Sequence, residues 1–161
     1  AEVVESLFAL AAVHRRLGHL QEIIIQNFQP KADTRMRYAP APATDYFATI
    51  VALARWVFGA EMNLQVPPNL TDDFAAHLDA GINDWGGVSP LTIDWVNPEA
   101  PWPQLERLQG VTEAAGFELR QRLPVYPEYV DAHWIDAGLW PQLAGAADAG
   151  GYAVPRKIAT A

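Results

Sequence analysis

The stretch LQEIIIQNF, residues Leu20–Phe28, is a nearly continuous apolar run of strand length. A run without polar alternation is typical of a parallel strand covered on both faces, so we expect this strand to be central. Upstream, apolar residues recur at spacings of three and four, which predicts a helix over Glu2–Leu17 that Gly18 closes. Downstream, QPKADTRMRYAPAP contains three prolines and no period, which predicts a loop.

The remaining chain continues the alternation of helices and short strands. The further predicted elements are a helix over Tyr46–Phe58 capped by Thr44 or Asp45, a strand over Met62–Val66, a helix from Thr71 to about Ala80, a strand over Ile82–Trp85, a helix over Gln104–Ala115, a half-exposed strand over Phe117–Leu123 and a short helix over Trp140–Ala147. A long proline-rich loop, 86–103, carries Trp95 and Trp102, which favour order. This alternation predicts a parallel α/β architecture, and the strands are too few to close a barrel. Half a barrel is the expected fold.

Composition excludes several classes of protein and site. The 161 residues are 50% hydrophobic and carry a formal net charge of -8, which argues against nucleic acid or an anionic membrane as the main partner. The absence of cysteine excludes a thiolate ligand or nucleophile from this chain. There is no apolar stretch of membrane-spanning length and no basic export signal at the start, so we expect a cytoplasmic protein. A start inside a helix without methionine is typical of a fragment.

Polar residues follow each predicted strand. They are Gln26, Asn27 and Gln29 after the first strand, Gln65 and Asn69 at the second, and Asn83, Asp84 and Trp85 at the third. Because ligands of parallel α/β sheets bind at the carboxyl ends of the strands, this set predicts hydrogen bonding to a heterocycle or ribose of a small-molecule substrate. The alternative is that strand-end amides satisfy local turns.

Other residue patterns are weaker. Lys31, Arg35 and Arg37 make the densest basic segment, either a carboxylate or phosphate clamp or a solvated loop. The four histidines lack the spacing of a helical metal site, so no metal is predicted from them. No nucleophile elbow, phosphate-binding loop or dinucleotide-binding turn occurs, and no proton donor or acceptor can be assigned.

Three further blocks of the sequence are HLQEIIIQNFQPKADTRM, GINDWGGVSPLTIDWVNPEAPWP and LRQRLPVYPEYV. These blocks, in this order, resemble FO synthase, specifically its CofG-type radical S-adenosylmethionine half. The resemblance implies a partial (βα) barrel in which a [4Fe-4S] cluster cleaves S-adenosylmethionine. The resulting radical acts on an adduct of tyrosine and 5-amino-6-ribitylaminouracil, giving the deazaflavin FO, precursor of coenzyme F-420. The family's cluster motif, C-x-x-x-C-x-x-C, is absent here.

The resemblance therefore implies the C-terminal half of a radical S-adenosylmethionine partial TIM barrel over residues 1–130, with 131–161 a C-terminal extension containing a short helix. It implies S-adenosylmethionine and a cluster in the complete enzyme, cluster ligands outside this chain, and no activity of the chain alone. Candidate contacts to substrate or S-adenosylmethionine are Gln26, Asn27, Asn69, Asn83, Asp84 and Trp85, with Lys31 and Arg35 as weaker candidates.

Two alternatives remain. One is a related radical enzyme of the futalosine route to menaquinone. The other is a cluster-free half-barrel with a binding or assembly role of its own. If the chain is a fragment, the missing N-terminal half of the barrel is expected to be a partner. The unpaired strand edges of a half-barrel also predict self-association.

Overall fold

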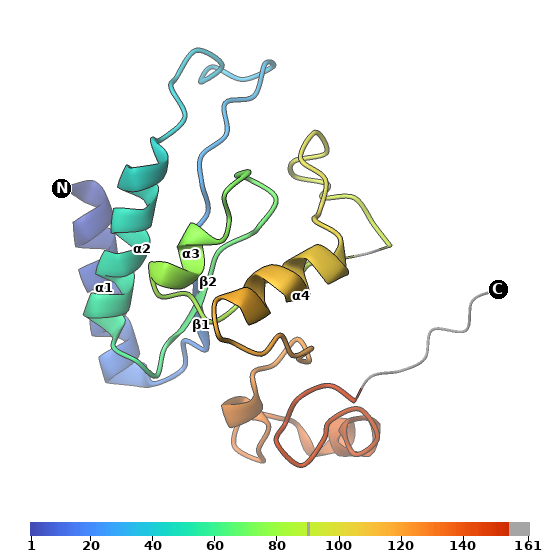
Figure 1. Ribbon diagram of the computed structural model, residues 1–161. Helices are drawn as coiled ribbons and strands as arrows, with labels where there is room; N and C mark the ends of the chain where they lie inside the picture. The colour runs from blue at the N-terminus through green and yellow to red at the C-terminus, as the bar shows by residue number, and fades with distance from the viewer. Residues whose placement is uncertain (90, 155–161) are drawn as a thin grey trace. The chain divides into compact units, whose positions relative to one another are not determined.

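The computed structural model describes residues 1–89 and 91–154 (Figure 1). The chain divides into two compact units, Ala1–Phe117 and Glu118–Ala161, and each is described by itself. The first unit is an α/β structure and contains every predicted site residue. No helix in the described part of the chain is both long and apolar enough to cross a membrane.

Two long helices lie side by side in the first unit (Figure 1). α1 (Glu2–Leu17) has the predicted bounds, and it ends at Gly18, whose φ of 68° is left-handed and whose N–H donates to the His14 carbonyl. α2 (Thr44–Phe58) begins earlier than predicted, and its N-cap is Ala43 without a side-chain bond. The predicted Thr44 or Asp45 cap is therefore wrong, because both residues already lie inside the helix.

The sheet consists of two parallel strands, β1 (Glu22–Ile24) and β2 (Asn63–Gln65), with Ile23 opposite Leu64. The predicted third strand is reduced to one parallel bridge between Gln65 and Asp84. The residues around that bridge still run beside β2, since Val66 N–H donates to the Asp84 carbonyl and Asp84 N–H donates to the Leu64 carbonyl. The order along the sheet is thus β1, β2 and the 83–84 segment.

The predicted central position of the first strand is wrong for this structure. β1 pairs only with β2 among the described residues, and the strand covers three residues of the nine-residue run. Ile23 is buried, whereas Ile24 on the opposite face is 55% exposed. The strand formed by this apolar run therefore has one buried face and one exposed face.

The core of the first unit lies between the sheet and the two long helices. Its members are buried apolar side chains in mutual contact, namely Leu7, Ile23, Ala54, Met62 and Leu64. Leu64 is fully buried. Burial of a leucine side chain of this kind contributes about 2 kcal/mol, which explains why β2 is held although it is only three residues long.

Two further helices complete the first unit. α3 (Ala76–Asp79) is shorter than predicted, because the chain from 71 to 75 forms turns before it becomes helical. α4 (Leu105–Ala114) agrees with the prediction. Trp85 joins it to the sheet, since its indole N–H donates to the Thr112 hydroxyl at 3.0 Å and its ring packs edge-on against Phe74.

Beside α2, His77 of α3 is almost completely buried. Its ring packs edge-on against Phe47, and neither ring nitrogen has a hydrogen-bond partner among the described residues. Burial lowers the pKa of His77 below its ordinary 6.5, although the Asp73 charge acts in the opposite direction. The folded protein therefore holds the neutral imidazole.

This burial predicts a stability that falls in mild acid. The unfolded chain takes up a proton at His77 below about pH 6.5 and the folded chain resists it, so stability is full above that pH and declines below it. Urea unfolding of the native chain should give a lower free energy at pH 5.5 than at pH 7.5, and His77→Leu should reduce the difference. His19→Gln, at an exposed histidine, is the control. Equal pH dependence in native protein and His77→Leu would contradict the prediction.

Over residues 118–154, the second unit contains short helical turns and one antiparallel bridge between Ala147 and Ala153. The helical turns are η1 (Pro127–Tyr129), η2 (Ala137–Leu139) and α5 (Trp140–Leu143). The predicted strand over Phe117–Leu123 is wrong, because those residues pair with no strand, and α5 ends before the predicted Ala147. Within this unit Arg120 instead forms an ion pair with Asp148 and lies over the Tyr152 ring. The predicted division into a barrel half over residues 1–130 and an extension over 131–161 stays a prediction, and residues 155–161 of that extension lie outside the described residues.

Candidate functional site

Three loops extend from the carboxyl ends of the strands in the first unit (Figure 1). Their described parts comprise residues 25–43, 66–75, and 86–89 with 91–104, and hydrogen bonds join each loop to the next. The Gln29 side-chain amide donates to the Leu70 carbonyl at 3.0 Å. The Asn69 amide donates to the Ala100 carbonyl at 2.9 Å. The edge of the sheet where ligands are expected is thus built from connected loops.

A cleft of about 420 Å³ opens between these loops, a volume in the range of small-molecule sites. Its lining combines proline, leucine and phenylalanine with polar and charged side chains. The lining residues are Gln29, Pro68, Asn69, Leu70, Thr71, Asp72, Phe74, Glu99, Ala100, Pro101, Pro103 and Arg107. Of the polar residues predicted at the ends of the strands, Gln29 and Asn69 line this cleft.

Asp94 organises the wall around Asn69. One of its carboxylate oxygens accepts hydrogen bonds from the side-chain amides of Asn69 and Asn97, at 2.9 and 3.0 Å, and the other accepts one from the Val96 N–H. Burial opposes ionisation, but these three bonds, with a backbone bond from Asn97, outweigh it and lower the pKa of Asp94 to about 2. The Asp94 carboxylate is therefore charged at neutral pH and fixes the Asn69 amide.

An ion pair connects the loop that follows β1 with the loop that follows the 83–84 segment. The Lys31 ammonium donates to the Glu99 carboxylate, which lowers the pKa of that carboxyl. Glu99 belongs to the cleft wall, so Lys31 is already neutralised by a residue of the site. Arg35, in the same loop as Lys31, is exposed.

Asp84 lies at the carboxyl end of the sheet next to a buried glutamine. Its Oδ1 accepts from the Gln65 amide at 3.3 Å and from the Gly86 N–H. Gly86 has a left-handed φ of 83°, and a Cβ there would lie 2.9 Å from the Gln65 side chain. Glycine at 86 therefore allows the chain to turn closely over Gln65 while its N–H holds the Asp84 carboxylate.

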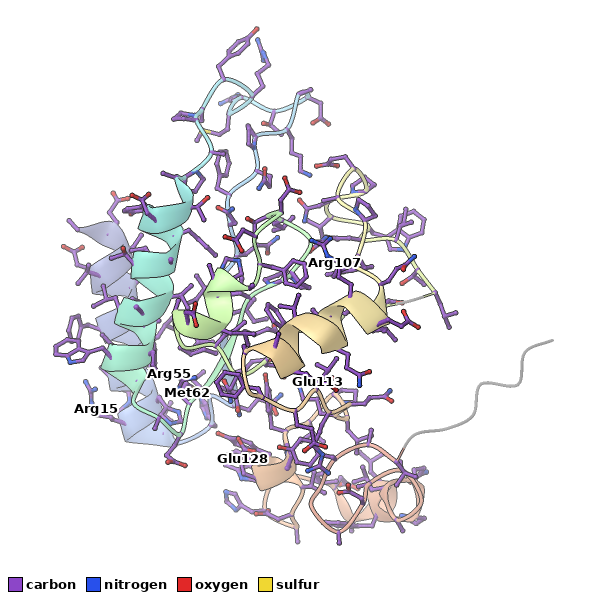
Figure 2. All side chains as sticks on the ribbon, viewed as in Figure 1. Arg15, Arg55, Met62, Arg107, Glu113 and Glu128 are labelled. Carbon is purple, nitrogen blue, oxygen red and sulfur yellow. The ribbon has the colours of Figure 1, made fainter. Side chains whose placement is uncertain are left out.

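Asn83 is held by the protein itself. Its Oδ1 accepts from the Leu64 N–H at 2.8 Å and from the Arg55 guanidinium at 3.2 Å, and its Nδ2 donates to the Asn63 side chain at 2.8 Å. Arg55 also donates to the carbonyls of Gly81, Gly59, Ala60 and Met62. Figure 2 shows Arg55 and Met62 near the end of α2, before β2 begins. Asn83 thus links the 83–84 segment to β2 and to Arg55 of α2.

The other predicted residues differ in their exposure to solvent. Trp85 is buried against Phe74 and Thr112, Gln26 is exposed after β1, and Asn27 is half-buried with its side-chain oxygen unpartnered among the described residues. Their roles as ligand contacts stay predictions. Sequence reasoning missed Asp94 as an organiser and Arg107 as part of the cleft, because nothing in the local sequence shows which loops meet. Within residues 1–89 and 91–154, no three acidic or histidine side chains gather as a metal-ion site would need.

Comparison with known proteins identifies relatives over most of the chain. The FO synthase of Streptomyces coelicolor is 53% identical over 150 residues, which are 91% of this chain and 17% of that protein. The 7,8-didemethyl-8-hydroxy-5-deazariboflavin synthase of Archaeoglobus fulgidus is 43% identical over 150 residues, 93% of this chain and 46% of the relative. The corresponding synthase of Methanopyrus kandleri is 48% identical over 139 residues, 86% of this chain and 41% of the relative.

No family model matches the chain, and no solved structure matches it. The chain spans less than half the length of each of these three relatives. The sequence identities of these relatives confirm the resemblance to FO synthase that the three sequence blocks predicted. This chain is therefore a homologue of one segment of the FO synthase family.

Proposed function

We propose that this chain is the segment of an FO synthase that forms one side of the active site for the deazaflavin-forming reaction. The observation that carries the proposal is the identity of 43–53% to synthases of that name across about nine tenths of the chain. The matched segment makes up 17% of one relative and 46% of another, so longer and shorter synthases both contain it. The product would be FO, the precursor of coenzyme F-420.

In this proposal the rest of the polypeptide supplies the iron–sulfur cluster. The residues present do not fit that group, because a [4Fe-4S] cluster of this family needs thiolates and the chain has no cysteine. In the complete enzyme, the cluster and S-adenosylmethionine would supply the radical that the resemblance implies. The chain alone is expected to be inactive, and a cytoplasmic location and a small-molecule substrate belong to the same proposal.

The partial barrel is also part of the proposal. Its support is the parallel order of β1, β2 and the 83–84 segment beside the helices of the first unit. In the complete enzyme a preceding barrel strand would pair with β1 on the side away from β2. In the isolated chain the same edge is expected to cause self-association.

Within the site, we assign ligand contact first to Asp84 and Asn69, which lie at the carboxyl edge of the sheet. We assign the same role to Gln26 and Asn27, which follow the first strand. The carboxylate of Asp84 would orient a hydroxyl or ammonium of the substrate. Lys31 and Arg35 are secondary. Asn83 and Trp85 are assigned positioning roles, because their polar atoms already bond to Leu64, Asn63 and Thr112.

The alternatives are less well supported. The relatives are named for deazaflavin synthesis, which does not favour a futalosine-pathway enzyme. A cluster-free half-barrel with an assembly role would share the exposed β1 edge, so the fold alone does not separate it from the proposal.

A chimera tests the proposal. The matching 150-residue segment of the Streptomyces coelicolor FO synthase is replaced by this chain, and the product is identified by mass spectrometry. The proposal predicts FO. A folded chimera that binds its cluster and cleaves S-adenosylmethionine but forms no FO would contradict it, and a futalosine-type product would support the first alternative. The matched control is the same synthase with the segment deleted.

A further inference from the structure

The Asn69 side chain uses both of its N–H groups inside the protein. Its Nδ2 donates to Oδ2 of Asp94 at 2.9 Å and to the Ala100 carbonyl at 2.9 Å. Its Oδ1 is buried and has no hydrogen-bond partner among the described residues. A buried acceptor in this state calls for a donor that the described chain does not supply. Asn69 therefore has one unused polar atom, and that atom can only accept a hydrogen bond.

The charge of Asp94 decides how the Asn69 amide is oriented. A carboxylate offers only acceptors, and the Ala100 carbonyl is also an acceptor, so the amide nitrogen must face both groups. Turning the amide by half a turn would place its oxygen against two acceptors and break both bonds. Hydrogen bonds from Asn97 and Val96 hold the Asp94 carboxylate in place and keep it ionised at neutral pH.

Asp94 acts on the cleft from behind its wall. Asn69 and Ala100 line the cleft, the first from the loop after β2 and the second from the loop after the 83–84 segment, whereas Asp94 is not a lining residue. Asn97 is 3% exposed, and its carbonyl accepts from the Ala100 N–H at 2.9 Å. The same short segment, 94–100, thus supplies both the carboxylate that orients Asn69 and a part of the opposite wall.

We infer that Asp94 is a positioning residue of this site, which holds the nitrogen of Asn69 so that its oxygen serves as a fixed hydrogen-bond acceptor for the substrate. Asn69 then selects an N–H or O–H group at that place and disfavours a carbonyl or carboxylate, which would leave the oxygen without a donor. The inference rests on the proposed function, because it takes this edge of the sheet as the active site. It adds that Asp94 acts through Asn69 and does not touch the substrate.

The first test measures the orientation of Asn69 without any substrate, by nuclear magnetic resonance of the isotopically labelled 161-residue chain. The two side-chain amide protons of Asn69 should exchange slowly with solvent, because both are hydrogen-bonded. Asp94→Asn keeps the size of the side chain but removes its charge, so their exchange should become about tenfold faster or more. Asp79→Asn is the matched control, because it removes the same charge from an exposed position of α3 and should leave the exchange unchanged.

The second test measures FO formation by the Streptomyces chimera, with the adduct of tyrosine and 5-amino-6-ribitylaminouracil as the varied substrate. Asp94→Asn should raise the KM for the adduct about tenfold or more and leave kcat within about threefold, whereas a loss of folded enzyme would lower kcat alone. The double substitution Asp94→Asn with Asn69→Asp again gives position 69 acceptors only. It should recover part of the loss in KM, which Asn69→Leu should not.

The two tests separate this inference from the proposed function. An unsubstituted chimera that forms no FO would contradict the proposed function, and the exchange measurement would still decide whether Asp94 orients Asn69. Exchange of the Asn69 amide in Asp94→Asn within about twofold of the native rate would overturn the inference. So would an active chimera whose KM is unchanged by Asp94→Asn, or is raised equally by Asp79→Asn.

Discussion

Arg55→Met should lower the free energy of unfolding by about 3 kcal/mol, a large share of the stability of a small domain. The Arg55 guanidinium donates to the carbonyls of Gly59, Ala60, Met62 and Gly81 and to the Asn83 side chain. Methionine keeps much of the apolar stem but leaves these acceptors without their donor. Because several are only partly buried, water replaces some of the lost bonds, and the effect is smaller than their sum.

Two further variants test whether this loss of stability is specific to the hydrogen bonds of Arg55. Arg55→Lys keeps the positive charge and can reach some of the carbonyls, so it should recover part of the loss. Arg15→Met removes an exposed arginine from the last turn of α1 and should cost about 1 kcal/mol or less. Urea unfolding followed by circular dichroism measures all three. A loss below about 1 kcal/mol for Arg55→Met would show that this guanidinium does not hold the starts of the strands together.

Gly86→Ala should destabilise the protein by about 2 kcal/mol. The residue has a left-handed φ, and the new Cβ would lie 2.9 Å from Cδ and Nε2 of Gln65, which is buried. Either the turn after Asp84 or the Gln65 side chain must move, and both moves disturb the Asp84 carboxylate.

The adjacent glycine provides the control for this substitution. A Cβ on Gly87 would meet no atom within 4 Å, so Gly87→Ala should be neutral or slightly stabilising. Thermal unfolding of the two variants under identical conditions measures the contrast. Equal melting temperatures for Gly86→Ala and Gly87→Ala would contradict the close packing of this turn over Gln65.

Local patterns predicted the helices of the first unit better than its strands. The period of α1 and the position of Gly18 are local signals, and α1 has the predicted bounds. The extent of β1 depends on a neighbouring strand, which the run of isoleucines cannot reveal, and its pairing with β2 covers only three residues. Phe117–Leu123 alternates as a strand does, but alternation forms a strand only where a partner strand is available.

The same distinction applies to the site. The rule that ligands bind at the carboxyl ends of strands located Asp84 and Asn69 at that edge. It could not show that Asn83, one residue before Asp84, bonds to Arg55 and Leu64 instead of facing the loops. Nor could it show that Arg107, on a helix 38 residues after Asn69, lines the same cleft, because only tertiary packing brings α4 to the loop that follows β2.

The most direct test of the account is FO synthesis by the Streptomyces chimera carrying Asp84→Asn within this segment. Asparagine retains the shape of the side chain and can still accept from the Gly86 N–H, but it removes the charge offered to the substrate. The account predicts that FO formation falls about 30-fold or more, with an unchanged melting temperature and unchanged cluster content. FO formation within twofold of the unsubstituted chimera would contradict the assignment of this edge of the sheet to the active site.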